Sequence, residues 1–185
     1  MDRTPESFAE ALASGDSDRV NAAIDEVEVA DATDRVETYP ALFEACYPVF
    51  ESDDGYVRQS VVRFLRDAYP MVELQIAAVE GDRVDGYTVA DLAEPRTLLV
   101  ELFLEALEDD DGRVRSAAAD GFDTLGVALD AAALDTERAA LLEALDELAE
   151  TLPDEKADHA ETAHRSVERM GFVGGLMSDI ELDSL

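Results

Sequence analysis

The stretch RTLLVELFLEALEDDDGRVRSAAADGFDTLG, residues 96–126, decides the fold. Its first half places apolar residues at the i, i+3, i+4 spacing of one helical face, and its second half does the same from Val114 to Leu125. Between the halves, EDDDG supplies aspartates that can cap a helix and a glycine at which the chain can turn. The stretch therefore predicts two antiparallel amphipathic helices joined by a tight acidic turn.

The pattern of this hairpin recurs along the chain. The second helices can be aligned with one another, and their equivalent positions are 37, 57 and 45 residues apart. A chain of 185 residues fits one domain that buries roughly 70% of its unfolded surface. We therefore expect a single domain, 1–185, with hairpins at about 5–28, 39–69, 96–127 and 136–170, an insertion at 70–94, and a C-terminal tail at 172–185. The tail is expected to cover the last hairpin, and a recognition peptide is the alternative.

Prolines and glycines set the expected helix boundaries. Residues 30–38 are expected to be a polar connection with at most one helical turn, and Pro40 is expected to open the next helix because proline fits a first helical turn. Pro48 falls inside the same helical pattern and predicts a kink, since it lacks a backbone donor. Gly171 is expected to end the last helix.

The turns at 53–55 and 110–112 lead into the same D-D-G-x-V-R sequence, which resembles the HEAT-type helical repeat. In that family an aspartate and an arginine flank the start of the second helix, and the matching residues here are Asp54, Arg58, Asp111 and Arg115. The first hairpin has Asn21 at the arginine position, and the fourth has Lys156 and Ala160 at the two positions. The resemblance implies an all-α, right-handed α-solenoid of about four antiparallel hairpins. It also implies that the Asp–Arg pairs form a hydrogen-bonded ladder between neighbouring hairpins.

The charge of the chain is extreme. There are 45 acids against 14 bases, which gives a net charge of −31, and Lys156 is the one lysine. Because 47% of the residues are hydrophobic and the acids occur in every segment, we expect a folded protein with an even acidic coat. Such a coat is typical of a cytoplasm with molar salt, where the Debye length is only ~3 Å. The alternative, a nucleic-acid mimic or a binder of basic partners, would concentrate its acids on one face.

Composition also argues against several classes of function. Binding to a nucleic acid or to an anionic membrane needs clustered Lys and Arg, so neither is expected. The sequence has no apolar run of 18 residues and no basic-then-apolar start, which predicts a soluble, cytoplasmic protein with no membrane span and no signal peptide. The single cysteine, Cys46, excludes an internal disulfide and lies on an apolar helical face.

No group of residues has the spacing of a catalytic or metal site. His159 and His164 lie about 140° apart around a helix, so they cannot chelate one ion, and a half-buried structural role is expected for His159. The acids at 109–111 lack the alternating ligands of a calcium loop and are better explained as helix caps. We therefore expect no enzyme activity, no cofactor and no bound metal.

The densest positive spot is formed by Arg58, Arg63 and Arg66. It could contact an acidic partner or a phosphate group, or it could be neutralised within the protein. Equivalent positions on the second helices alternate in sign along the series Glu26, Arg63, Asp120 and Arg165. An ion-pair ladder between parallel helices is therefore the favoured interpretation.

HEAT-like solenoids mostly serve as binding scaffolds, so the resemblance implies a non-catalytic scaffold or adaptor whose partner is another protein. The expected binding surface is a concave ridge formed by the second helices, with Gln59, Arg63, Arg66, Ser116, Asp120 and Arg165. The alternative is an accessory or enzyme-associated protein, as in HEAT-like families that assist bilin attachment or act on modified DNA bases. Those roles need a dedicated pocket or a basic groove, and the sequence indicates neither. A purely structural partner of one other protein is a third possibility.

The acidic coat generates a prediction about salt. Dilution from about 1 M to millimolar salt lengthens the Debye length from ~3 Å to well over 10 Å, so repulsion among the carboxylates favours the unfolded chain. Circular dichroism is expected to show a large loss of helicity on this dilution. Unchanged spectra across the titration would rule out adaptation to high salt.

Overall fold

The computed structural model describes the backbone of residues 4–79 and 83–182, and the side chains within these ranges up to Arg169. Over this part of the chain the fold is all-helical, and the one extended pairing is an isolated bridge between Val84 and Tyr87. The elements follow one another as α1 (Pro5–Ala13), α2 (Ser17–Glu28), α3 (Ala32–Cys46), the 3-10 helix η1 (Tyr47–Glu51), α4 (Gly55–Ala68), α5 (Val72–Ala77), the 3-10 helix η2 (Val89–Leu92), α6 (Ala93–Leu107), α7 (Gly112–Ala131), α8 (Asp135–Thr151) and α9 (Asp154–Leu182).

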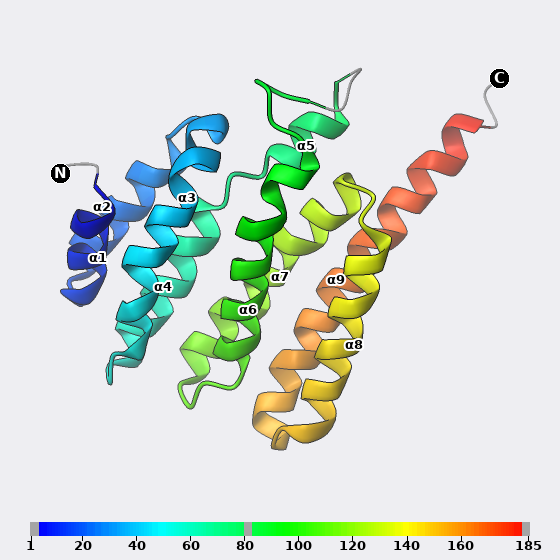
Figure 1. The fold of residues 1–185 in the computed structure, drawn as a ribbon. Coiled ribbons are helices and arrows are strands. Elements are labelled where there is room, and N and C mark those ends of the chain that lie inside the picture. Colours follow the sequence, from blue (N-terminus) through cyan, green and yellow to red (C-terminus); the bar gives the residue numbers. More distant parts are fainter. Residues whose placement is uncertain (1–3, 80–82, 183–185) are drawn as a thin grey trace.

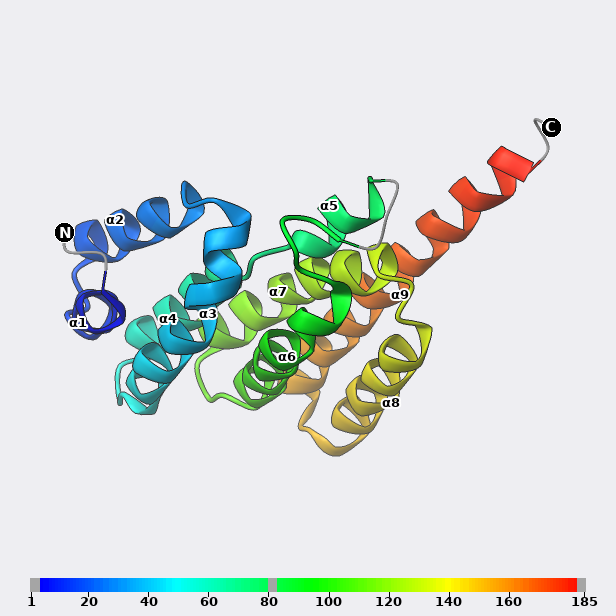
Figure 2. The same ribbon diagram turned by 45° about the horizontal axis from the view of Figure 1, so that its top comes forward.

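The helices are arranged as neighbouring pairs that follow the order of the chain (Figure 1). In one layer α2 contacts α4, α4 contacts α7, and α7 packs extensively against α9. In the other layer α1 contacts α3 and α3 contacts α6, while α8 packs chiefly against α9 (Figure 2). The insertion contributes α5, which lies against α7. The second helices of the pairs, α2, α4, α7 and α9, thus form one continuous layer.

The aspartates of the turns cap the second helices, as the sequence predicts. Asp16 caps α2, Asp54 caps α4 by accepting from the backbone N–H of Tyr56 at 2.8 Å, and Asp111 caps α7. Each carboxylate satisfies a backbone donor that has no partner within its helix. The same local chemistry therefore begins α2, α4 and α7.

The core lies between the two layers and joins successive pairs. Phe8 of α1 packs on Phe64 of α4 with ring centroids 5.2 Å apart, and Phe103 of α6 meets Phe122 of α7 edge-on at 5.5 Å. A Cβ atom at Gly121 would collide with the ring of Phe103, so this glycine is what lets α6 and α7 approach so closely. Deep burial of such rings makes aromatic packing a large part of the stabilisation.

The second hairpin begins earlier than predicted. Residues 32–38 belong to α3, so the expected connection at 30–38 is wrong, and Pro40 lies inside the helix rather than at its start. Asp31 caps this helix, and the extra turns bury Val36 and Tyr39. Burial of these side chains outweighs the loss of one backbone hydrogen bond at an exposed proline.

The predicted disruption at Pro48 takes the form of a change in helix type. The α-helical geometry of α3 ends at Cys46, and the chain continues as η1 with Pro48 in its first turn. Proline is tolerated there because the first donors of a helix have no intrahelical acceptor.

The last helix is longer than predicted. α9 continues past Gly171 to Leu182, so the expected cap at this glycine and a separate tail at 172–185 are both wrong. A glycine inside a helix costs only about 1 kcal/mol relative to alanine, which does not end a helix by itself. The final turns of α9 extend beyond the other helices instead of covering the last hairpin (Figures 1 and 2), and the predicted tail residues 183–185 lie outside the described part of the chain.

Candidate functional site

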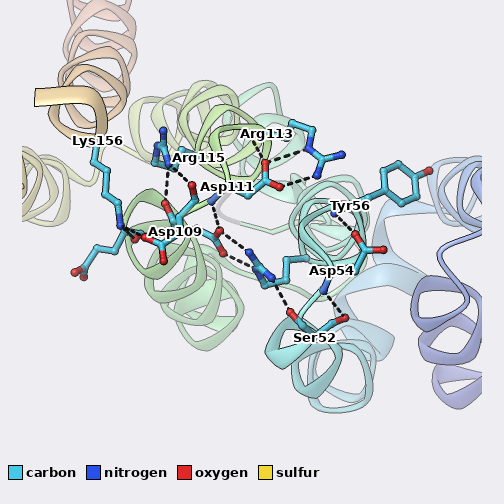
Figure 3. Close-up of polar contacts among 11 residues, drawn as sticks. Ser52, Asp54, Tyr56, Asp109, Asp111, Arg113, Arg115 and Lys156 are labelled. Carbon is cyan, nitrogen blue, oxygen red and sulfur yellow. Dashed lines mark hydrogen bonds and ion pairs between the residues drawn. The ribbon is translucent and has the colours of Figure 1, made fainter. Parts of the chain in front are cut away.

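A network of charged hydrogen bonds joins the turns that precede α4 and α7 to the first turn of α9 (Figure 3). Its first cross-link is Arg58 of α4, whose Nε and Nη2 donate to the two carboxylate oxygens of Asp109 at 2.7 and 2.8 Å. The third guanidinium nitrogen, Nη1, donates to the carbonyl oxygen of Ser52 at 2.7 Å. One arginine therefore closes its own turn and clamps the turn of the next hairpin through a bidentate pair.

Arg115 of α7 repeats this arrangement one hairpin further on. Its Nη1 donates to the carbonyl oxygens of Asp109 and Asp110 at 2.9 and 3.0 Å, and its Nη2 donates to Glu155 of α9 at 2.8 Å. The bonds from Arg58 to the Ser52 carbonyl and from Arg115 to the Asp109 carbonyl join residues that are each six positions apart. The sequence repeat is therefore also a repeat of hydrogen bonds.

Lys156, in the first turn of α9, completes the network. Its Nζ donates to the carbonyl oxygen of Glu108 at 2.6 Å and to the carboxylate of Asp110 at 2.7 Å. The HEAT-like pattern marked this position as a lost aspartate. In the structure this position carries the opposite charge, and the lysine side chain binds the acidic turn of the preceding hairpin.

The network lies where the sequence predicts a ladder, but its acidic partners are different. Asp54 and Asp111 were expected to pair with Arg58 and Arg115, and neither does so. Both carboxylates face the backbone donors that they cap, and Asp111 also pairs with Arg113 at 2.6 Å. Asp109 is the residue that sequence reasoning missed, because three adjacent aspartates offer no local signal for which one faces the neighbouring hairpin.

Contacts within the network keep its carboxylates ionised. Burial raises the pKa of Asp109, but the hydrogen bonds from Arg58 and from the backbone N–H of Asp111 more than offset it, so this pKa lies below its usual range. The hydrogen bonds from the Arg113 side chain and backbone lower the pKa of Asp111 to about 2. Because both pKa values are depressed in the folded protein, their stabilising effect is present above about pH 4 and is lost as the pH falls through the lowered values.

The close approach of the two turns depends on a glycine. A Cβ atom at Gly55, the first residue of α4, would overlap the carboxylate of Asp111 on the next hairpin. The equivalent glycine of the next repeat, Gly112, faces the guanidinium of Arg115 at an ordinary van der Waals distance and has room for a methyl group. Gly55 therefore serves contact between hairpins, which the sequence pattern did not distinguish from turn formation.

The predicted binding surface falls on a single layer of second helices. Gln59, Arg63 and Arg66 are half-buried on α4, Ser116 and Asp120 are exposed on α7, and Arg165 is exposed on α9. Since α4 contacts α7 and α7 contacts α9, the structure places these residues on adjacent helices.

The ion-pair ladder expected on this surface does not form. Within the described residues Arg63 has no ion pair or hydrogen bond through its side chain, and Arg165 donates to the carbonyl of Glu161 and the hydroxyl of Thr162 on its own helix. Besides the Arg115–Glu155 pair, α7 and α9 are joined by Asp123–Arg169 at 3.2 Å, about one helical turn beyond the predicted positions.

Arg66, unlike Arg63, has an acidic partner, which lies on its own helix. It pairs with Asp67 at 2.7 Å. Burial lowers the pKa of Arg66, but this hydrogen bond and the nearby charges of Asp67, Asp120 and Glu28 raise the pKa above its usual value. Arg63 is thus left without a fixed acidic partner on a half-buried position.

The histidines are half-buried and face different helices. His159 contacts the hydroxyl of Ser116 on α7 at 3.3 Å, and His164 lies 3.3 Å from Asp146 on α8. In the described residues no three His, Cys, Asp or Glu side chains are grouped so that they could hold a metal ion. His159 and His164 therefore tie α9 to its two neighbours.

A buried ionic cluster in the insertion was not predicted. Glu73 of α5 is fully buried, and one of its oxygens accepts from the Tyr69 hydroxyl at 2.5 Å and from Nη1 of Arg96 at 3.0 Å. The cluster attaches α5 to the start of α6. The sequence VELQIA carries a weak signal, because Glu73 stands next to Val72 and one turn before Ile76 on the same apolar side.

Comparison with known proteins finds no matching family model, no matching curated protein and no matching solved structure. Among the described helices none combines the length and the apolar character needed to cross a membrane.

The network predicts unequal roles for two arginines that lie two positions apart on α7. The Arg115 side chain is 2% exposed and that of Arg113 is 57% exposed. Arg115→Met leaves two carbonyls without their donor and is expected to cost about 2–3 kcal/mol of unfolding free energy. Arg113→Met is the matched control, expected to cost less than about 0.5 kcal/mol because its ion pair is exposed. Urea unfolding of both variants at constant high salt measures the difference, and equal losses would contradict the assigned role of Arg115.

Proposed function

We propose that this protein is a HEAT-like α-solenoid of four hairpins and that it acts as a non-catalytic scaffold for another protein in a salt-rich cytoplasm. Three features support the solenoid: helix pairs that follow the chain order, a continuous layer of second helices, and a repeated arginine cross-link between turns. The acidic composition supports the salt-rich setting.

The proposal rests chiefly on Arg63 and on the surroundings of its side chain. In a chain with 45 acids and 14 bases, an arginine near the middle of the second-helix layer has no acidic partner among the described residues. It lies one turn from Gln59 on α4, and α4 packs against α7, which carries Ser116 and Asp120. This arrangement leaves a cation and several hydrogen-bonding groups available to a protein that presents a carboxylate.

A role on nucleic acid is less well supported by the same surface. The arginines of α4 and α9 are separated by the acidic side chains of Asp120 and Asp123 on α7. Such alternation of sign repels a continuous line of phosphates, whereas it can match the mixed charges of a protein surface.

The proposal is tested by capture at the salt concentration of the source cells. The tagged protein is expected to retain a specific partner, and Arg63→Glu is expected to reduce its retention at least about tenfold through like-charge repulsion. Arg83→Glu, at an exposed position in the insertion, is the matched control and should retain the partner normally. Equal capture by both variants would show that the second-helix layer around Arg63 is not the binding surface, and tight binding of duplex DNA at the same salt would contradict the scaffold role.

A further inference from the structure

The opposite layer of the molecule has a groove between α6 and α8. It has a volume of about 310 Å³ and is lined mainly by apolar side chains. Val100 and Leu104 of α6 form one wall, Ala140 and Ala144 of α8 form the other, and Leu129 of α7 lies at the base. None of these residues belongs to the surface around Arg63, so the groove is a separate feature.

The groove exists because the first helices of the pairs, α1, α3, α6 and α8, are not packed equally closely along their layer. α1 contacts α3 and α3 contacts α6, whereas α8 makes its main contacts with α9. Where α8 faces α6, it carries Ala140 and Ala144, whose methyl groups are too short to fill the space. A groove left unfilled beside half-buried valine and leucine side chains is a place where apolar groups of another molecule gain by leaving water.

The dimensions of the groove suit a short helix. The lining residues of α6 extend from Arg96 to Leu104, which corresponds to about 12 Å along the helix axis. Two helical turns of a ligand have the same length and present two or three apolar anchors at i, i+3 or i+4, and i+7. Few polar groups converge on the groove, which argues against a small polar ligand.

The charged residues at the edge of the groove favour one class of ligand helix. Glu101 on the α6 wall and Glu137 on the α8 wall are both exposed at the groove. They favour a ligand that carries Lys or Arg beside its apolar residues. A second copy of this chain is disfavoured, because each copy has a net charge of −31 and would place further acids against these two.

We infer that the groove between α6 and α8 binds an amphipathic basic helix of a partner protein, as a second docking surface beyond the one around Arg63. The inference rests on the scaffold role, but it uses different residues and can be tested alone. Binding is driven by burial of leucine-type side chains against Val100 and Leu104, and the two glutamates align the basic residues of the ligand.

The test uses a fluorescein-labelled peptide of leucine and lysine with helical spacing, about four turns long. Its binding to the full chain is followed by fluorescence anisotropy at a salt concentration where circular dichroism shows full helicity. Ala144→Trp fills the groove and is expected to weaken binding at least about tenfold. Ala139→Trp adds the same ring at an exposed position of α8 outside the groove, and is expected to change binding less than about twofold.

Two double variants, which remove the same charge at different places, test whether binding depends on the glutamates at the groove or only on the net charge of the protein. Glu101→Gln combined with Glu137→Gln is expected to weaken peptide binding several-fold, whereas Glu143→Gln combined with Glu147→Gln removes the same charge elsewhere on α8 and is expected to have little effect. Equal effects of the two double variants, or of the two tryptophan variants, would overturn the inference, because binding would then be non-specific attraction to an acidic protein.

Two further outcomes separate this inference from its rivals. A dimer in sedimentation analysis that Ala144→Trp dissociates would assign the groove to a second copy and overturn the inference. Arg63→Glu is expected to leave peptide binding unchanged. If it instead abolished binding at full helicity, the peptide would be bound on the opposite layer and the groove would not be its site.

Discussion

The structure depends on an arginine near the start of a second helix that is bound to two turns at once. Arg58 donates to the carbonyl of Ser52 in its own hairpin and to the carboxylate of Asp109 in the next. Arg115 does the same with the carbonyl of Asp109 and the carboxylate of Glu155. Each guanidinium supplies several donors in one plane, so a single side chain can satisfy backbone and neighbour together, which an ammonium group with its tetrahedral donors does less well. The turns are thereby held at a fixed spacing, and the helices that follow them form one layer.

This constraint matters more in an acidic chain than it would in a neutral one. With a net charge of −31, neighbouring hairpins repel each other wherever their carboxylates meet. At the acidic turn before α7 the repulsion is converted into attraction, because Asp109 pairs with Arg58 of α4 and Asp110 pairs with Lys156 of α9. Three of the 14 bases, Arg58, Arg115 and Lys156, serve these contacts, whereas Arg63 has no ion pair among the described residues and is available to a partner.

Much of the fold could be predicted from the sequence, because helical periodicity and capping residues act locally. The two helices of the hairpin at 96–126 and the capping by Asp54 and Asp111 follow from such signals. The start of α3 could not be predicted, since burial of Val36 and Tyr39 outweighs the local preference of Pro40. The end of α9 could not be predicted either, because the low helix propensity of glycine suggested an end at Gly171, whereas the helix continues to Leu182.

The candidate site was predicted less completely, because it depends on register between helices. The pair that forms is Asp123 and Arg169, each about one turn beyond the expected Asp120 and Arg165, and the register between α7 and α9 differs from the expected one by a single residue. The choice of Asp109 among three adjacent aspartates, and the burial of Glu73 beside Arg96, are likewise set by neighbours far away in the sequence. Periodicity identifies which residues face a neighbouring helix, but not which of them meet.

The coupling of hairpins through the arginine is tested most directly by a double-mutant cycle on Arg58 and Asp109. Unfolding free energies of the wild type, Arg58→Ala, Asp109→Ala and the double variant, measured at constant high salt, give the interaction energy of the pair. A half-buried bidentate pair predicts about 1–3 kcal/mol of favourable coupling. The exposed pair of Arg113 and Asp111 within one turn, treated in the same way, should give less than about 0.5 kcal/mol. A coupling near zero between Arg58 and Asp109 would contradict the account, because the two hairpins would then be held together by the apolar core alone.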